Sequence, residues 1–216
     1  MKELIRMYEY ESDLLRQGFK YIVGVDEVGR GPLAAGVLAA AVILDPNTKI
    51  EGLNDSKQLS EKKRLQLSEE IKNKALAYSY GYVNEKKIDE INIYEASKLG
   101  MLRALSYLKI KPDYILSDAM PLKEQSIPYQ AIVKGDTLSA SIAAASIIAK
   151  VKRDEIMEKL AFIYPDYGFE KNKGYPTPIH LEQLKIKGPS KIHRMTYKPV
   201  KDCLLTQLVL EGLDEI

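Results

Sequence analysis

Residues 22–31 read IVGVDEVGRG, and the rest of the chain is organised around them. Apolar and small residues typical of a strand lead directly into two neighbouring carboxylates, Asp26 and Glu27, and a Gly-Arg-Gly turn follows at once. Two adjacent like charges raise each other's pKa when they are buried, and they resist joint ionisation. A divalent cation removes that cost, because hard cations such as Mg²⁺ prefer carboxylate oxygens. This stretch therefore predicts a metal site where a strand ends.

The turn after the two acids is suited to a phosphate or a sugar. Gly29 and Gly31 have no Cβ, so the backbone there can adopt positive φ, and a ligand can approach its N–H and C=O groups closely. Arg30, between them, carries a planar and permanently charged group that matches phosphate. An Asp-Glu pair alone usually marks a charged turn at the end of a strand. The full run indicates metal-dependent phosphodiester chemistry instead.

The composition is that of a globular protein with one domain, or with one domain and an appended helical segment. The 216 residues are 45% hydrophobic and 29% charged, which is enough apolar material to bury a core. Net charge is only +2, but residues 171–198 contain seven Lys or Arg against a single acid, Glu182. A local excess of this kind favours a phosphate-facing surface.

Cysteine usage and the apolar pattern exclude several classes of protein. Cys203 is the only cysteine, so the chain has no disulfide framework and no cysteine-based zinc site. His180 and His193 lie thirteen residues apart without a supporting cysteine, and we do not expect them to bind zinc. The first eleven residues lack the apolar core of a signal peptide, and no apolar run approaches the ~20 residues of a membrane span. We expect a cytoplasmic protein without membrane contact.

Apolar periodicity predicts a mixed sheet with flanking helices. The run GVLAAAVIL at residues 36–44 has no polar face, as expected for a strand that is covered on both sides. The other predicted strands are residues 21–25, 75–83, 114–117 and 129–133, and the predicted helices are residues 4–17, 61–70, 87–108 and 139–163. After residue 165 the chain changes to short helical pieces separated by Gly and Pro, which predicts a C-terminal helical extension.

Three predicted strands lead to acids, namely Asp26 with Glu27, then Asp118, then Asp136. Neighbouring strand ends can gather such carboxylates around metal ions, which a lone aspartate cannot do. Asp136 also precedes the long predicted helix, whose N-terminal dipole favours negative charge. Asp154 lies on the charged half of that helix, where an acid is more often solvated or ion-paired than a ligand, and we leave it outside the site.

Several motifs occur together in one order along the chain. They are GVDEVGRGPLAAG, LNDSKQLSEKKR, SDAM, KGD followed by SIAAASIIAKVKRD, YGFEKNKGYPT and GPSKIHR, spread from about residue 14 to residue 200. In this order the chain resembles bacterial type 2 ribonuclease H, also called ribonuclease HII. One departure is the run Ala35-Gly36-Val37, where the family usually has Gly-Pro-Val.

The resemblance implies a ribonuclease H-like α/β fold, with a catalytic domain over residues 1–164 and a substrate-binding extension over residues 165–216. It implies an endoribonuclease that cleaves the RNA strand of RNA–DNA hybrids. It also implies incision of DNA on the 5′ side of an embedded ribonucleotide, which leaves 3′-hydroxyl and 5′-phosphate ends. Two Mg²⁺ or Mn²⁺ ions would be held by four acids, which are Asp26, Glu27, Asp118 and Asp136.

The resemblance further implies a recognition site for the sugar. Gly29, Arg30 and Gly31 would read the ribose 2′-OH together with Tyr175, and Lys57 would face the substrate backbone. The 2′-OH is the group that separates RNA from DNA, and backbone groups bared by glycines can both donate to it and accept from it. The tail of the chain lacks the aromatic pair of a sliding-clamp-binding peptide, so we expect no such contact, and we expect a monomer.

Two other classes of protein fit parts of the sequence. In a P-loop nucleotide-binding protein, Lys and Ser or Thr follow the second glycine; Gly31 and Gly36 have the required spacing, but Val37 stands in place of the lysine. A non-catalytic RNA- or hybrid-binding module combines basic residues with surface aromatics, and it has no use for acids at strand ends. Metal-dependent cleavage would separate the enzyme from such a module.

Overall fold

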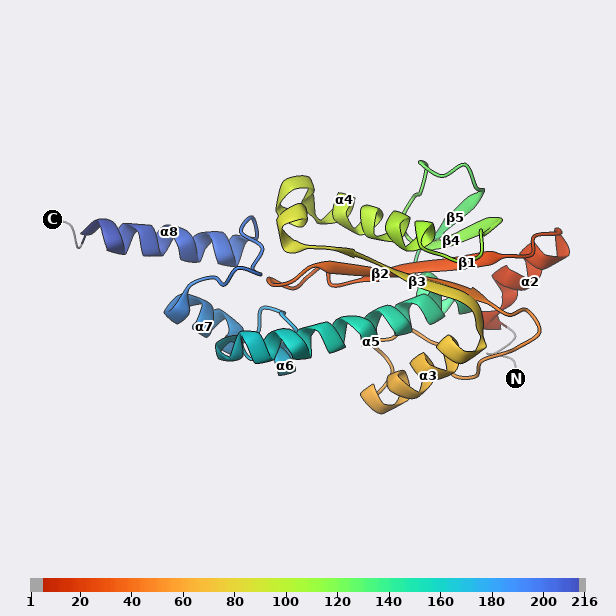
Figure 1. Cartoon of the computed structure of the whole chain (residues 1–216), viewed down its shortest axis with the longest axis horizontal. Coiled ribbons are helices and arrows are strands. Elements are labelled where there is room, and N and C mark those ends of the chain that lie inside the picture. Colours follow the sequence, from red (N-terminus) through yellow and green to blue (C-terminus); the bar gives the residue numbers. More distant parts are fainter. Residues whose placement is uncertain (1–5, 214–216) are drawn as a thin grey trace. The chain divides into compact units, whose positions relative to one another are not determined.

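The computed structural model describes residues 6–213, with side chains as far as Leu205 (Figure 1). None of the helices in that part of the chain is long and apolar enough to cross a membrane. The chain folds into two compact units. The first comprises Met1–Val28, Leu38–Tyr82 and Ser97–Lys152, and the second comprises Gly29–Val37, Val83–Ala96 and Arg153–Ile216. The division at residue 164 that we expected between a catalytic and a substrate-binding part stays a prediction.

The first unit is built on a mixed sheet. In the described part of the chain this sheet has five strands in the order β3-β2-β1-β4-β5. β1 (Ile22–Val28) pairs antiparallel with β2 (Val37–Leu44) and parallel with β4 (Tyr114–Asp118), which pairs parallel with β5 (Tyr129–Ile132). β3 (Ala75–Val83) forms one edge of the sheet. The predicted mixed sheet is thus confirmed.

β2 is covered on both faces, as its apolar run predicted. Val42 and its alternate neighbours pack against α3 (Glu61–Lys74) and the first half of α5 (Ala140–Ile163). Ala41 and its alternate neighbours pack against the last turns of α4 (Glu85–Ser106). This alternation follows from the two-residue period of a strand. Figure 1 shows α4 on one side of the sheet and α3 and α5 on the other.

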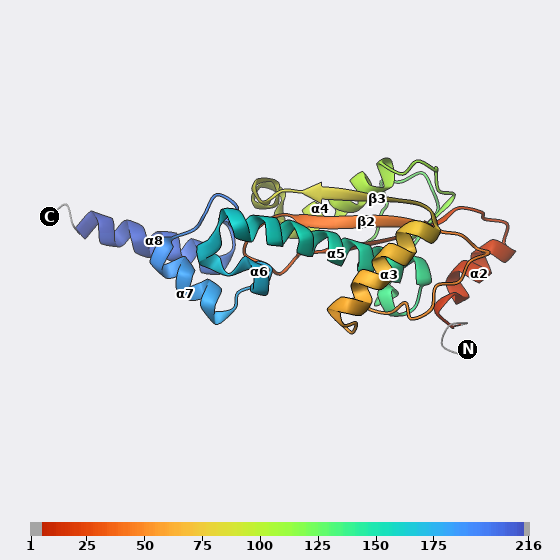
Figure 2. The ribbon, with the colours of Figure 1, turned by 60° about the horizontal axis from the view of Figure 1, so that its bottom comes forward.

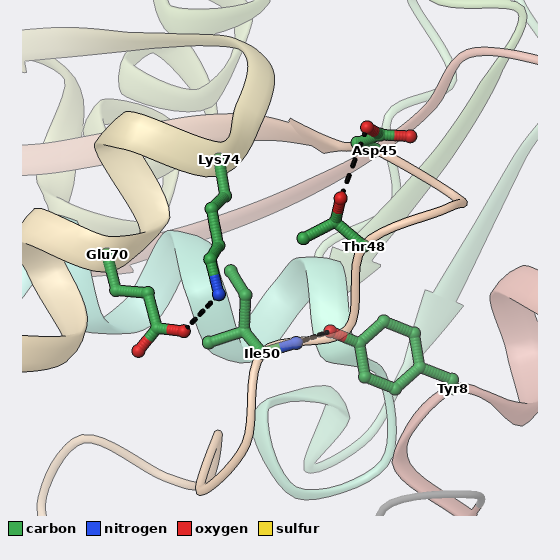
Figure 3. A network of polar contacts seen from close by, with 6 residues as sticks. All are labelled: Tyr8, Asp45, Thr48, Ile50, Glu70 and Lys74. Carbon is green, nitrogen blue, oxygen red and sulfur yellow. Dashed lines mark hydrogen bonds and ion pairs between the residues drawn. The ribbon is translucent and has the colours of Figure 1, made fainter.

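The N-terminal helix α2 (Glu9–Arg16) is attached to the loop that follows β2. Tyr8, directly before the helix, is almost fully buried, and its hydroxyl accepts a hydrogen bond of 2.9 Å from the Ile50 amide (Figure 3). Burial raises the pKa of this phenol. α2 lies within the helix predicted over residues 4–17, of which residues 4 and 5 lie outside the described part.

Two elements differ from the prediction in ways that affect the site. β1 continues to Val28, because β2 pairs with it from Val23 to Val28, and β4 includes Asp118. The acids on these strands therefore lie within the sheet and not in the turns behind it. α4 is interrupted at Asn92, where φ is 64° and ψ is 168°. The single helix predicted over residues 87–108 is therefore two helical segments.

In the second unit, C-terminal helical segments pack around Gly29–Val37. This segment shares one apolar cluster with α7 (Pro178–Lys187) and α8 (Lys198–Leu213), which lie side by side (Figure 2). It shares another cluster with η2 (Pro165–Tyr167) and α6 (Phe169–Asn172). The short helical pieces predicted after residue 165 are present, and they enclose the turn that follows β1.

Candidate active site

β1 and β4 bring acids from two strands to neighbouring positions. The strands are parallel, and Val25 is paired with Ser117, so Asp26 and Asp118 follow at the same level of the sheet. Asp26 is only 5% exposed. This burial raises its pKa well above the usual range, and the charges of Glu27 and Asp118 raise it further. The pair of strands therefore places carboxylates where their mutual repulsion is strong.

A backbone hydrogen bond connects Asp118 to the turn that carries Asp136. This turn is the 3-10 helix η1 (Gly135–Thr137), which the chain enters through Lys134 in the left-handed conformation. The Gly135 amide donates to Oδ1 of Asp118 over 2.8 Å. The acid at the end of β4 and the acid ahead of α5 are thus held by one short connection.

Asp136 lies among charged residues of the loop before α3. Burial, and then the charges of Asp118 and Asp55, raise its pKa to about 6, whereas Lys57 opposes this shift. The structure thus brings Lys57 to this site and adds Asp55, which was not among the predicted site residues.

The acids of the predicted metal site are electrostatic neighbours. Asp26 is repelled by Glu27 and Asp118, and Asp136 is repelled by Asp118. In the part of the chain that the structure describes, no three His, Cys, Asp or Glu side chains are gathered closely enough to hold a metal ion. The donor chemistry still fits a hard divalent cation, because such an ion would offset the repulsion among these carboxylates.

Within the second unit, Tyr175 lies against the Gly29-Arg30-Gly31 turn. A Cβ at Gly31 would be 3.3 Å from Cε1 of Tyr175, so the ring packs on the bare backbone of this glycine. Next to this contact, the Leu33 amide donates to the Gly174 carbonyl over 2.8 Å. The structure therefore brings together the two parts of the predicted sugar-recognition site, which are far apart in the sequence.

A buried arginine holds the carbonyl groups of this turn. Arg194 is fully buried, and its Nη2 donates to the Gly29 oxygen over 2.6 Å. Its Nη1 and Nε donate to the oxygens of Arg30 and Ala35, each over 2.8 Å. The sequence indicated Arg194 as part of a basic, phosphate-facing surface. That interpretation is wrong for this residue, because its planar group binds backbone oxygens inside the unit.

A second buried arginine explains why position 29 is a glycine. Gly29 has a φ of +98°, and a Cβ there would lie 2.3 Å from Nε of Arg153. Arg153 is itself 1% exposed and donates to the carbonyls of Lys173 and Ala34. Because these bonds hold the guanidinium in place, it cannot move aside at low cost. Glycine is therefore required both by the backbone angle and by the available space.

Glu11 is a further residue that the sequence did not indicate. It is 6% exposed, and its Oε1 accepts hydrogen bonds from the hydroxyls of Ser139 and Ser141 and from the Ser141 amide. It thereby holds the start of α5, directly after the turn that carries Asp136. The contact joins residues 128 positions apart, so no local pattern of the sequence could show it.

The similarity to known proteins extends over most of the chain. Residues 23–200 match the family described as Ribonuclease HII. A protein named Ribonuclease HII from Listeria monocytogenes serovar 1/2a is 53% identical over 203 residues, which cover 94% of this chain and 77% of that relative.

Solved structures agree with this match. Ribonuclease H2 from Pyrococcus horikoshii OT3 is similar with a TM-score of 0.73 and 30% identity, over 85% of this chain and 97% of that chain. The RNase HII of Archaeoglobus fulgidus, solved in complex with PCNA, is similar with a TM-score of 0.69 and 28% identity, over 82% and 95%. With its ribonuclease H-like sheet and these matches, the chain belongs to the ribonuclease HII family of hydrolytic endoribonucleases.

Proposed function

We propose that this ribonuclease H is metal-dependent, and that it incises duplex DNA on the 5′ side of an embedded ribonucleotide as well as cleaving the RNA strand of RNA–DNA hybrids. The observation that supports this most is the set of mutually repelling acids on β1, β4 and η1. Burial raises the pKa of both Asp26 and Asp136, and the charge of Asp118 acts on each of them. Such a set is costly unless a cation binds to it.

Asp26, Glu27, Asp118 and Asp136 would hold two Mg²⁺ or Mn²⁺ ions, for which carboxylate oxygens are suitable ligands. Ions bound there would supply an activated water and a counter-charge for the departing 3′ oxygen. The contribution of the protein is orientation. The Glu27 amide donates to Oδ1 of Asp26 over 2.7 Å, and the Gly135 amide donates to Oδ1 of Asp118 over 2.8 Å. One oxygen of Asp26 and one oxygen of Asp118 are thereby held in place.

Tyr175 and the Gly29-Arg30-Gly31 turn would read the ribose 2′-OH. A phenol can donate to a hydroxyl and accept from it, and Tyr175 is 40% exposed, so a substrate can reach it. Arg194 sets the orientation of the turn by holding two of its carbonyls. Arg30 and Lys57 are exposed and would bind backbone phosphates without reading the sequence.

The two histidines argue against a metal-free route. Ribonucleases of that kind use the 2′-OH as the nucleophile, and they need a general base and a general acid, commonly histidines. His180 and His193 are both buried and are hydrogen-bonded to each other, so neither is available to a substrate as a base. Without such a base, we do not expect the 2′-OH to act as the nucleophile. The cut is then expected 5′ to the ribonucleotide, where its own 2′-OH cannot reach the phosphate.

A duplex with a single ribonucleotide tests this proposal. With Mg²⁺ we expect one cut that leaves a 3′-hydroxyl and a 5′-phosphorylated ribonucleotide, and no 2′,3′-cyclic phosphate. A chelator should stop the reaction. Mass spectrometry of both fragments identifies the ends. A cyclic phosphate that still forms in chelator would overturn the metal mechanism, and binding without any cleavage would favour the hybrid-binding module.

The same assay assigns the acids. Asp118→Asn keeps the oxygen that accepts from Gly135 but removes the charge. We expect cleavage to fall about 10³-fold or more, the effect of several kcal/mol of lost charge stabilisation, while hybrid binding stays largely intact. Asp45→Asn is the control, because Asp45 is a turn residue that accepts from the Asn47 amide over 2.9 Å. Full activity of Asp118→Asn at saturating Mg²⁺ would remove Asp118 from the metal site.

The assembly of the protein stays a prediction. We expect a monomer that makes no sliding-clamp contact. The side chains of residues 206–216, which form most of the tail considered for such a peptide, lie outside the described part of the chain.

A further inference from the structure

Two buried histidines form a hydrogen-bonded pair in the second unit. His180, in α7, is 0% exposed and His193 is 1% exposed, and their Nε2 atoms lie 3.0 Å apart. Nδ1 of His180 lies 2.8 Å from the Tyr175 carbonyl oxygen. Nδ1 of His193 lies 2.9 Å from the Ser190 amide and 2.8 Å from the Ser190 hydroxyl. All four ring nitrogens of the pair therefore have a partner.

The two ends of this series of hydrogen bonds determine where each proton lies. The Ser190 hydroxyl can donate or accept, but the Ser190 amide can only donate, so Nδ1 of His193 is an acceptor and a neutral His193 carries its proton on Nε2. A carbonyl oxygen can only accept, so His180 carries its proton on Nδ1 and accepts from His193 at Nε2. Hydrogen bonds are thus donated in one direction, from Ser190 through the two neutral rings to Tyr175.

The surroundings favour the neutral form of both rings. The ring centroid of Tyr167 lies 4.9 Å from that of His193, and the centroid of Phe169 lies 5.2 Å from that of His180. Burial lowers the pKa of both histidines, and His180 lowers that of His193 further, to about 4. Burial also raises the pKa of Tyr167. A further proton on either histidine would set two N–H groups against each other.

We call this series of hydrogen bonds, from Ser190 through His193 and His180 to Tyr175, the relay. One end of the relay holds the backbone of Tyr175. The Tyr175 carbonyl accepts from Nδ1 of His180 and from the Thr177 amide, each over 2.8 Å, and its amide donates to the Asn172 carbonyl over 2.9 Å. Because Tyr175 is 40% exposed, packing alone does not fix its ring against Gly31. The hydrogen bonds to its backbone add a second restraint.

The other end of the relay lies beside Arg194, which holds the carbonyl groups of the Gly29-Arg30-Gly31 turn. His193 immediately precedes Arg194, whose amide donates to the Leu33 carbonyl over 2.8 Å and whose side chain holds the carbonyls of Gly29 and Arg30. The relay therefore connects the segment that carries the tyrosine with the segment that shapes the turn.

We propose that His180 and His193 are positioning residues for sugar recognition, because the neutral pair holds Tyr175 against the Gly29-Arg30-Gly31 turn. The proposal rests on the proposed role of Tyr175 in reading the 2′-OH. Phenylalanine could fill the space of either ring, but it would remove one hydrogen-bond partner from the partly buried Ser190 amide or from the Tyr175 carbonyl. Two histidines satisfy a donor at one end and an acceptor at the other.

Nuclear magnetic resonance of protein with ¹⁵N-labelled histidine tests the relay without any substrate. At pH 7 we expect two neutral rings in opposite tautomers, with the proton of His180 on Nδ1 and that of His193 on Nε2. A charged ring, or the same tautomer in both residues, would overturn the relay.

Cleavage of the single-ribonucleotide duplex tests the positioning role. His180→Phe should lower kcat/KM about tenfold, as expected for one lost hydrogen bond, with little change in duplex binding. His180→Asn keeps an amide donor near the place of Nδ1 and should recover most of this loss. Tyr167→Phe is the control, because it removes a buried hydrogen bond of 2.7 Å to Gly188 in the same cluster without touching Tyr175. It should leave kcat/KM unchanged.

A double-mutant cycle separates this inference from the proposed function. If His180 acts through Tyr175, His180→Phe should cause no further loss of cleavage in a Tyr175→Ala background. Additive losses in a wild type that cleaves with Mg²⁺ would overturn the positioning role alone. A wild type that does not cleave would overturn the proposed function, and the tautomers would still decide whether the relay exists.

Discussion

The carboxyl of Asp136 loses its proton at a higher pH than an ordinary aspartate, because it is buried beside Asp118 and Asp55. Its pKa is raised from the ordinary value of 3.8 to about 6, so the native state holds this proton more tightly than the unfolded chain does. The stability that the group contributes is fully present below about pH 3.8, and it is lost as the pH rises through about 6. At neutral pH without metal, the ionised group therefore destabilises the fold.

Asp136→Asn should accordingly raise the melting temperature of the metal-free protein at pH 7.5, by about 2–4 °C for each kcal/mol of relieved repulsion. The gain should disappear near pH 4, where the native carboxyl is already protonated. Calorimetry in chelator at the two pH values measures both effects. If the variant melts clearly below the parent at pH 7.5, the acids do not form the repelling cluster described here.

At the scale of elements, two glycines separate backbone strain from steric conflict. Gly18, after α2, and Gly29, after β1, both have a φ of +98°. A Cβ at Gly18 would meet nothing within 4 Å, whereas a Cβ at Gly29 would lie 2.3 Å from Nε of Arg153. Replacement by alanine therefore causes backbone strain at Gly18, and it causes both backbone strain and a steric conflict at Gly29.

Gly18→Ala should cost about 1 kcal/mol of unfolding free energy, which is the penalty of the left-handed conformation. Gly29→Ala should cost about 1–3 kcal/mol more, because either Arg153 or the turn must shift. It should also slow cleavage at a ribonucleotide, which Gly18→Ala should not. Urea unfolding and the cleavage assay measure the two effects. Equal losses of stability would mean that Arg153 does not confine the turn.

At the scale of the whole molecule, metal binding should stabilise the native state by mass action. At a free Mg²⁺ concentration 100 times the Kd, the gain is about 2.7 kcal/mol. For a chain of this size that corresponds to a rise in melting temperature of roughly 5–10 °C. Asp118→Asn should lose most of this rise, and Asp45→Asn should keep it. An equal rise in Asp118→Asn and in the parent would contradict the metal site.

The sequence by itself determined the elements and the kind of chemistry. The unbroken apolar run at residues 36–44 predicted a strand covered on both faces, because no position in it can face water cheaply. The run at residues 22–31 predicted a strand that leads into two acids, followed by an open turn. The order of the motifs indicated the family, and the match over residues 23–200 confirmed it. These conclusions were accessible because each strand and each motif is defined by neighbouring residues.

Only the tertiary structure decided how distant residues act on one another. Arg194 looked like a surface base, yet it is fully buried and holds the Gly29 and Arg30 carbonyls. Glu11 looked like a helix charge, yet it holds the start of α5. The two histidines showed no pattern at all until the fold paired their rings. The local sequence around a charged or polar residue is the same whether its side chain faces water or a buried carbonyl. Only the packing of distant segments determines which of the two the side chain contacts.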